Sequence, residues 1–239
     1  MWFGNEFRDL KVHFGGKHPS TWILKEKISE HADSYGEEES EAVEAMSEAR
    51  AVFLCSKCDN KNTEVAVVKV YMQIPWTGTE LDTAERRRAQ AYPGRSEVAQ
   101  DEIYALAQLT AAGCSSTPKL LEEKHIKQWD TLPVPGGSLA FILMEKLPGQ
   151  RVERIADLAL PEREAMRASF KKGWNECYAA GIVPADSGIR NLLWDRKQKK
   201  CYIVDFGHWY DSSMYSGWRD GRFEMWDLMV FLSNGEWGP

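Results

Sequence analysis

The sequence predicts an α+β fold, with an antiparallel sheet in the first part of the chain and mainly helices in the second. Three observations indicate this fold class. Short runs rich in β-branched and aromatic residues, separated by turn-forming residues, recur through residues 21–147 and are typical of strands. Two longer segments, 96–112 and 161–180, repeat apolar residues at helical spacing. Further along, two apolar runs flank a polar turn, as they do in a β-hairpin.

The chain is long enough for one globular protein with two lobes, since it has 239 residues and 43% of them are hydrophobic. We expect residues 1–20 to be an N-terminal extension, because Gly15, Gly16 and Pro19 mark a loop there. A sheet-based N-terminal lobe should cover 21–147, and a short, truncated helical C-terminal lobe 148–239. In the first lobe we expect a partial helix from residue 39, a turn at 59–62, a helical turn within 72–95, and strands at 21–28, 51–55, 64–71, from 118 onwards and at 139–144.

The most informative stretch is the predicted hairpin. Residues 192–194 and 201–204 are apolar and strand-like, and the polar residues between them favour a turn. A hairpin brings its two ends together, so side chains that flank it should converge. Three such side chains carry oxygen atoms: Asp186 before the first strand, Asn191 at its start and Asp205 after the second strand. Two carboxylates and an amide carbonyl suit a hard cation such as Mg²⁺, and Asp186 could also accept a hydroxyl proton.

These residues also resemble a known pattern. Asp186, Asn191 five residues later and the sequence Asp205-Phe206-Gly207 resemble the catalytic loop and metal-binding motif of protein-kinase-like proteins. The pattern is most similar to the aminoglycoside phosphotransferase and choline kinase branch, as small fungal kinase-like proteins carry it. The resemblance implies a two-lobed protein-kinase-like fold, ATP and Mg²⁺ as cofactors, Asp186 as catalytic base, and Asn191 and Asp205 as metal ligands. One position departs from the family: Pro184 stands two residues before the aspartate, where histidine is usual, and this affects loop geometry more than chemistry.

Lys69 lies within the apolar strand-like run VAVVKVY, where an unpaired ammonium group is costly to bury. In the kinase-like fold, such a lysine holds the nucleotide phosphates and pairs with a glutamate of a helix. The helix predicted at 96–112 offers Glu97 and Glu102. We prefer Glu102, because it directly precedes the apolar Ile103. The alternative is a lysine at a strand edge whose amine extends into water.

The segment ILMEKLPG resembles the hinge between the lobes of the phosphotransferase branch. This resemblance implies that Met144, Glu145 and Leu147 bind the cofactor, with backbone groups that contact adenine. The glycine-rich turn that kinases use to cover the phosphates is replaced by a segment with Gly36 and six glutamates, Glu37, Glu38, Glu39, Glu41, Glu44 and Glu48. Two interpretations stay open: the acidic segment projects into solvent as an insertion, or it weakens nucleotide binding.

In the second lobe, Pro161 suits the first turn of the helix at 161–180, whose buried face we expect to comprise Met166, Phe170, Trp174 and Cys177. A further apolar helix is expected at 223–232, where it could brace the catalytic loop. There is no A-P-E motif, which argues against a protein substrate. The additional C-terminal helices with which small-molecule kinases build an acceptor pocket are missing from the sequence, so the acceptor is not specified.

Composition and charge limit the classes of binding partner and the cellular compartment that we expect for this protein. A net charge of −6 with scattered basic residues argues against nucleic-acid binding. We expect no membrane span and no signal peptide, and five cysteines fit a reducing, cytoplasmic setting. The C-x-x-C pair of Cys55 and Cys58 lacks a second ligand pair for zinc, so we interpret it as incidental.

Three functions compete on this sequence. The first is a Mg·ATP-dependent phosphotransferase acting on a small hydroxyl- or amine-bearing molecule. The second is a pseudokinase that serves as a scaffold or binding protein, which Pro184, the missing glycine-rich turn and the short second lobe favour. The third is a kinase fold repurposed for another reaction, since a fold does not fix a function. Aromatic residues near the motif could line an acceptor pocket or belong to the core: Trp194, Trp209, Tyr210 and Trp218.

Overall fold

The structure is a computed structural model that describes residues 1–16, 19–58, 64–231 and 237–238. The chain divides into two compact units. One unit consists of Met1–Gln100 and Leu120–Lys146, and the other of Asp101–Lys119 and Leu147–Pro239. The helix α3 (Glu97–Ala111) therefore starts in the sheet-containing first unit and continues in the second. Secondary structure of both types confirms the α+β class.

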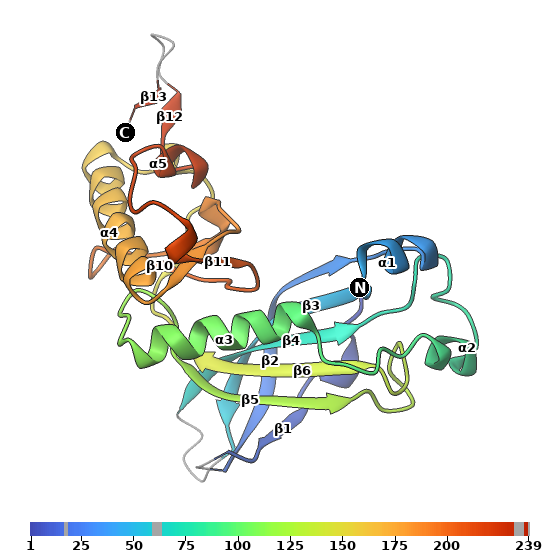
Figure 1. The fold of residues 1–239 in the computed structure, drawn as a ribbon. Coiled ribbons are helices and arrows are strands. Elements are labelled where there is room, and N and C mark those ends of the chain that lie inside the picture. Colours follow the sequence, from blue (N-terminus) through green and yellow to red (C-terminus); the bar gives the residue numbers. More distant parts are fainter. Residues whose placement is uncertain (17–18, 59–63, 232–236, 239) are drawn as a thin grey trace. The chain divides into compact units, whose positions relative to one another are not determined.

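The first unit is built on an antiparallel six-stranded sheet with the order β1-β2-β3-β4-β6-β5 (Figure 1). The central strands β4 and β6 are almost entirely buried, which explains why the sequence shows them as continuous apolar runs. The strands are β1 (Lys11–Phe14), β2 (Ser20–Asp33), β3 (Glu48–Lys57), β4 (Val65–Gln73), β5 (Leu120–Lys127) and β6 (Ser138–Glu145).

The described residues 1–16 and 19–20 are part of this sheet unit, so the expectation of an N-terminal extension is wrong. Strand β1 pairs with β2, and the buried side chains Phe3, Phe7, Val12 and Phe14 join the core. Phe3 and Phe7 contact edge to face, with ring centroids 4.8 Å apart, and the 3-10 turn at Asn5–Phe7 brings the two rings together. A strand of four residues is too short to show a clear alternation in the sequence, although Val12 and Phe14 do alternate with exposed neighbours.

One strand of the first unit is irregular, and two of its connections contain a helix. Strand β2 is longer than expected, and its register with β3 shifts between Leu24 and Lys27 and again between Lys27 and Ser29. The acidic segment forms helix α1 (Glu37–Val43), and the loop expected over 72–95 contains helix α2 (Ala84–Ala89). The turn expected at 59–62 lies outside the described residues.

The second unit is organised around helix α4 (Leu160–Ala179), which packs against strands β8 and β10. Its four predicted face residues, Met166, Phe170, Trp174 and Cys177, are fully buried, which confirms that prediction. The strands form three small antiparallel sheets, β10-β9-β7, β11-β8 and β12-β13. Their bounds are β7 (Gln150–Arg151), β8 (Ile182–Pro184), β9 (Leu192–Asp195), β10 (Lys200–Ile203), β11 (Trp209–Asp211), β12 (Val230–Phe231) and β13 (Trp237–Gly238), with 3-10 turns at Ile155–Asp157, Ile189–Asn191 and Ser212–Met214.

The helix expected at 223–232 is wrong. Helix α5 spans only Arg222–Met225, and Val230–Phe231 is strand β12, while Leu232 lies outside the described residues. Asp227 has a φ of 56°, a left-handed conformation that a continuing helix does not contain. Phe223, Trp226 and Leu228 are nevertheless buried, so the apolar pattern reports burial and not helical structure. Within the described residues, no helix is long and apolar enough to cross a membrane.

Candidate functional site

The predicted hairpin is present, and it sets the geometry of the candidate site. Strands β9 and β10 pair antiparallel, with Leu192 opposite Ile203 and Asp195 opposite Lys200. The turn between them is held by the carboxylate of Asp195, which accepts hydrogen bonds from the backbone N–H groups of Lys197 (2.9 Å) and Gln198 (3.1 Å). Asn191 and the segment that leads to Asp205 therefore flank the same, open end of a fixed hairpin.

The loop that carries Asp186 is anchored on its N-terminal side by a short ladder. Pro184 ends strand β8 and pairs with Trp209 of β11, and the Ala185 backbone N–H donates to the His208 carbonyl at 3.1 Å. A proline at the last position of a short strand loses no essential hydrogen bond to the ladder. Pro184 is thus compatible with an ordered loop.

The middle of this loop requires glycine. Gly188 has a φ of 145°, and an added Cβ atom would lie 2.3 Å from a guanidinium nitrogen of Arg190. The next residue, Ile189, donates its backbone N–H to the carboxylate of Asp227 at 3.3 Å. Asp227 is the residue whose left-handed conformation interrupts the expected C-terminal helix, so this interruption places a carboxylate where it supports the loop.

Asp186 and Asn191 are in direct contact. The Asn191 amide nitrogen donates to the Asp186 carboxylate at 2.8 Å and to the Asp186 carbonyl at 2.9 Å. Asn191 is only 7% exposed. Neither bond uses the side-chain carbonyl oxygen Oδ1 of Asn191, which is the atom through which an asparagine side chain binds a metal ion.

The residues on either side of Asp205 are held by hydrogen bonds to other parts of the second unit. The Val204 N–H donates to the Asn191 carbonyl at 2.9 Å, and the Phe206 N–H donates to the Glu102 carboxylate at 3.2 Å. Asp205 itself has a φ of 68°, which aspartate tolerates better than most residues. The backbone around Asp205 is thus tied to Asn191 and to α3 within the same unit.

The structure also places Arg190 beside Asp186, a contact that sequence reasoning missed. The Arg190 guanidinium donates to the Asp186 carboxylate oxygen that Asn191 does not use. The Arg190 side chain is 60% exposed and the Asp186 side chain 33% exposed, so the ion pair lies at the surface. The signal in the sequence was a positive charge directly before the predicted metal ligand.

Lys69 and Glu102 are both buried, with 4% and 1% exposure. The Lys69 amine lies 5.1 Å from the ring centroid of Tyr71, and Glu102 binds the Phe206 amide. Glu97, the competing candidate, is exposed. Lys69 belongs to the first unit and Glu102 to the second, so their ion pair stays a prediction.

Glu48 is a second buried acid that sequence reasoning missed. It is 8% exposed, and among the described residues its Oε2 atom has no hydrogen-bond partner. Burial raises the pKa of its carboxyl group to about 7, while a hydrogen bond from Ser96 and the charges of Arg50 and Lys69 act in the opposite direction. No sequence signal distinguishes Glu48, because it is one of six glutamates in the acidic segment and the other five are exposed.

Three predicted site residues remain, and two of them end a strand of the sheet. Met144 and Glu145 close strand β6, where they pair with Val67 and Ala66, and Leu147 is a buried residue of the second unit. Their contact with adenine stays a prediction. Helix α1, with its exposed glutamates, occupies the connection between β2 and β3, and the structure places no glycine-rich turn between these two strands.

The two residues of the cysteine pair lie in different environments. Cys55 is buried in β3 and its pKa is raised to about 12 by burial, whereas Cys58 is exposed. In the described part of the chain, no group of three His, Cys, Asp or Glu side chains could hold a metal ion. That finding does not cover a set that includes an asparagine, so the metal role of Asn191 and Asp205 stays a prediction.

Comparisons with known proteins add little to this geometry. No family model and no curated protein matches the sequence. Among solved structures that resemble the chain is the kinase PK-1 of Cydia pomonella granulovirus, with 17% sequence identity and a TM-score of 0.43. The match covers 80% of this chain and 52% of the viral kinase, so the chain spans about half the length of that protein. A likeness of this degree does not establish a shared fold, and the proposal below rests on the side chains themselves.

Proposed function

We propose that this protein is a phosphotransferase that uses Mg·ATP and acts on a small hydroxyl- or amine-bearing molecule. The observation that carries the proposal is the contact between Asp186 and Asn191, together with the backbone bond that ties Asn191 to the residue before Asp205. An acid, an amide and a second acid at one end of a rigid hairpin are a suitable set for phosphoryl transfer, which depends on positioning and on neutralising charge.

In this proposal each residue has a distinct role. Asp186 accepts the proton of the acceptor hydroxyl or amine, and Asn191 and Asp205 hold Mg²⁺. The bound cation would neutralise charge on the phosphates. Lys69 binds phosphate oxygens with Glu102 as its counter-ion, and the backbone at Met144, Glu145 and Leu147 contacts adenine.

A specific observation favours a second candidate, a kinase-like protein without catalysis. Arg190 neutralises the proposed base Asp186, and the buried Glu48 places an acid near the proposed phosphate-binding Lys69. Both features would oppose turnover and would suit a scaffold or binding protein. A third candidate, another reaction in the same site, keeps the residues but changes the acceptor chemistry.

A thermal-shift titration with Mg·ATP tests the proposal. At a concentration a hundredfold above the dissociation constant, binding should stabilise the folded protein by about 2.7 kcal/mol. ATP with a chelator should stabilise it less, because the metal-bridged contacts would be lost. Asp205→Asn should weaken the Mg·ATP effect, and the matched control Asp157→Asn, an exposed acid of the same unit paired with Arg154, should not. No shift at millimolar Mg·ATP would exclude both the phosphotransferase and any nucleotide-binding scaffold.

A further inference from the structure

Two thiols from distant parts of the chain meet inside the second unit. Cys114 lies in the loop after α3, and Cys177 lies in the last turn of α4. Both cysteines are free, and the Cys177 thiol donates a hydrogen bond to the Cys114 sulfur atom. Cys177 is 0% exposed, whereas Cys114 is 6% exposed. Because both residues belong to the same unit, their contact is part of its own packing.

The loop that carries Cys114 lies tightly against α4. Gly113, directly before it, has a φ of 70°, the left-handed conformation in which helices commonly end. At Gly173 of α4, an added Cβ atom would lie 2.7 Å from the Cβ atom of Ser116, so the loop approaches the helix too closely for a larger residue. The Ile203 backbone N–H donates to the Ser116 carbonyl at 2.8 Å, which also ties the loop to β10.

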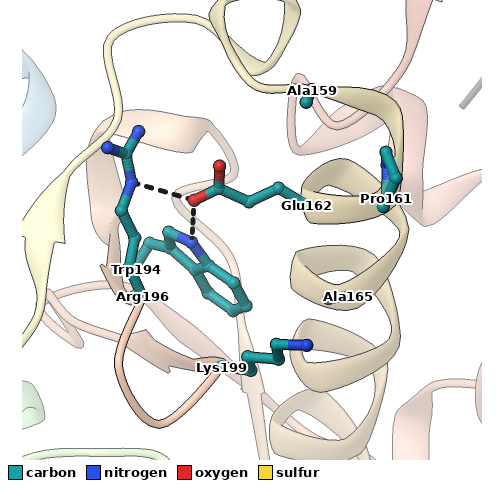
Figure 2. A pocket seen from close by; sticks show the side chains of 7 residues that line it. All are labelled: Ala159, Pro161, Glu162, Ala165, Trp194, Arg196 and Lys199. Carbon is teal, nitrogen blue, oxygen red and sulfur yellow. Dashed lines mark hydrogen bonds and ion pairs between the residues drawn. The ribbon is translucent and has the colours of Figure 1, made fainter.

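Helix α4 is anchored to the β9–β10 hairpin. Near its N-terminal end, one oxygen of Glu162 accepts a hydrogen bond from the Trp194 indole N–H at 2.8 Å and forms an ion pair with Arg196 at 2.8 Å (Figure 2). Further along the helix, the Ser169 hydroxyl accepts a hydrogen bond from the Cys201 backbone N–H at 2.8 Å. The helix and the loop are therefore both fixed to the hairpin, so the relative position of the two thiols is fixed as well.

Glu176 connects the loop directly to the turn of α4 that carries Cys177. Its carboxylate accepts hydrogen bonds from the Ser115 backbone N–H at 3.0 Å and from the Cys114 thiol at 3.5 Å. The Ser115 hydroxyl also donates to this carboxylate, at 3.2 Å. Cys114 thus has a carboxylate that receives its proton and a neighbouring thiol that donates to its sulfur atom.

Cys114 is the more acidic of the two thiols. The hydrogen bond from Cys177 lowers the pKa of Cys114 to about 7, although burial and the charge of Glu176 act in the opposite direction. The same hydrogen bond, together with burial, raises the pKa of Cys177 well above its usual value. Near pH 7 about half of the Cys114 side chains are therefore thiolates, the form that reacts with oxidants, and the exposed part of Cys114 gives access to a small one.

We propose that Cys114 and Cys177 form a reversible disulfide when the protein encounters hydrogen peroxide. The Cys114 thiolate attacks one peroxide oxygen, so an S–O bond forms, the O–O bond breaks and hydroxide leaves, taking up the proton that Cys114 released. The Cys177 sulfur then attacks the Cys114 sulfur, so the S–S bond forms and the S–O bond breaks. The departing oxygen takes the Cys177 proton and leaves as water. Two thiols are oxidised to a disulfide, and one peroxide is reduced to two water molecules.

The disulfide joins the loop after α3 to the end of α4 and closes the chain between residues 114 and 177 into a covalent loop. Such a crosslink restricts the unfolded chain, so oxidation should stabilise the second unit if the native positions of the sulfur atoms suit the bond. The inference rests on the two thiols and their surroundings, and it stands whether or not the protein transfers phosphate.

Peptide mapping of the full chain by mass spectrometry tests the proposal. Trypsin places the five cysteines in separate peptides, with Cys114 in residues 96–119 and Cys177 in residues 173–190. After treatment with hydrogen peroxide and alkylation of the remaining thiols in denaturant, these two peptides should be recovered linked in most molecules. Dithiothreitol should release them. Cys201, which is fully buried in β10, should be recovered alkylated from the same sample.

Serine variants test the order of the two steps. In Cys177→Ser, Cys114 should stop at the sulfenic acid, which dimedone traps, because the second thiol is missing. In Cys114→Ser, Cys177 should stay reduced, because it is fully buried. Cys58→Ser removes an exposed cysteine and is the matched control, and it should leave the linked peptides unchanged. The mapping of the wild type decides the proposal even if a variant of a buried thiol does not fold.

Urea unfolding shows whether the bond fits the native structure. The oxidised wild type should have a midpoint about 1 M or more above that of the reduced protein, and Cys58→Ser should show the same difference. Three results would overturn the inference: no linked peptides at a peroxide concentration that oxidises Cys58, a link that forms only in urea, or an oxidised protein that unfolds at lower urea than the reduced one.

Discussion

Asn191 and Glu48 are both buried polar residues, and the two units of the chain satisfy them differently. Asn191 donates two hydrogen bonds through its amide, and its backbone carbonyl receives the Val204 N–H. Glu48 retains a buried carboxylate oxygen without a hydrogen-bond partner among the described residues. The difference teaches that the first group is stabilised by a local network, whereas burial of the second favours its protonated form despite the hydrogen bond from Ser96 and the charges of Arg50 and Lys69. We therefore expect substitutions in the Asn191 network to change activity and stability, and we expect the contribution of Glu48 to stability to change with pH.

The largest effect is expected at Asp186. If it is a general base, Asp186→Asn should lower turnover by about 10²–10⁴-fold, because the amide cannot accept the proton. Nucleotide binding should change little, since Asn191 and Asp205 are the proposed metal ligands. Phosphoryl transfer should be measured with an acceptor found by screening hydroxyl- and amine-bearing compounds.

Asp157→Asn serves as the control for Asp186→Asn, because it removes a carboxylate from an exposed ion pair of the same unit. Equal and small effects of the two variants on turnover would show that Asp186 is not a base. The scaffold function would then be the better explanation of an intact Mg·ATP response.

The next largest effect is the pH dependence of stability that Glu48 should cause. The folded-state pKa is raised from 4.5 to about 7, so the folded protein holds this proton more tightly than the unfolded chain does. The resulting stabilisation is fully present below the unfolded value and is lost as the pH rises through about 7. This difference in pKa corresponds to roughly 3 kcal/mol in the free energy of unfolding.

Urea unfolding of the wild type and Glu48→Gln between pH 5 and pH 8 measures this effect. The variant should lose this contribution to the pH dependence, because glutamine remains neutral throughout. Glu41→Gln, which changes an exposed acid of α1, should retain the wild-type slope. A wild-type slope that Glu48→Gln leaves intact would assign the titration to another group.

The comparison also shows what the sequence could predict. The hairpin, the strand that contains Lys69 and the helix α3 follow from apolar patterns that local neighbours determine. The convergence of Asn191 and Asp205 follows from the hairpin alone. Glu48 could not be predicted, because its burial depends on pairing between β3 and β4 and on Ser96, more than 40 residues away.

Two errors have the same physical origin. Strand β1 was missed because its pairing with β2 is a tertiary contact of a four-residue segment. The helix expected at 223–232 was wrong because the apolar residues there are buried by packing against α4, as the cation–π contact of Arg167 with Phe223 and the ring contact of Phe170 with Trp226 show. Arg190 was missed because its role depends on the fold of the Asp186 loop.

A moderate effect is expected from the network of the second unit. Asn191→Ala removes a buried amide that bonds both the carboxylate and the carbonyl of Asp186, so it should destabilise the protein by about 1–3 kcal/mol. Unfolding by urea would measure it. Ser115→Ala, which removes a hydroxyl from an exposed hydrogen bond with Glu176, should cost clearly less. If the two variants cost the same, the Asp186 loop is not stabilised by Asn191.

The smallest effect on stability, and the one that separates enzyme from scaffold, concerns Arg190. Its ion pair with Asp186 is at the surface, so Arg190→Gln should change the free energy of unfolding by less than about 1 kcal/mol. If Asp186 is a base, the variant should raise turnover, because it frees the carboxylate oxygen that Arg190 binds for the proton of the acceptor. Arg196→Gln, an exposed arginine of the same unit whose ion pair is with Glu162, should leave turnover unchanged. Equal turnover in both variants and the wild type would mean that the Arg190 ion pair does not restrain the proton acceptor, even if the protein transfers phosphate.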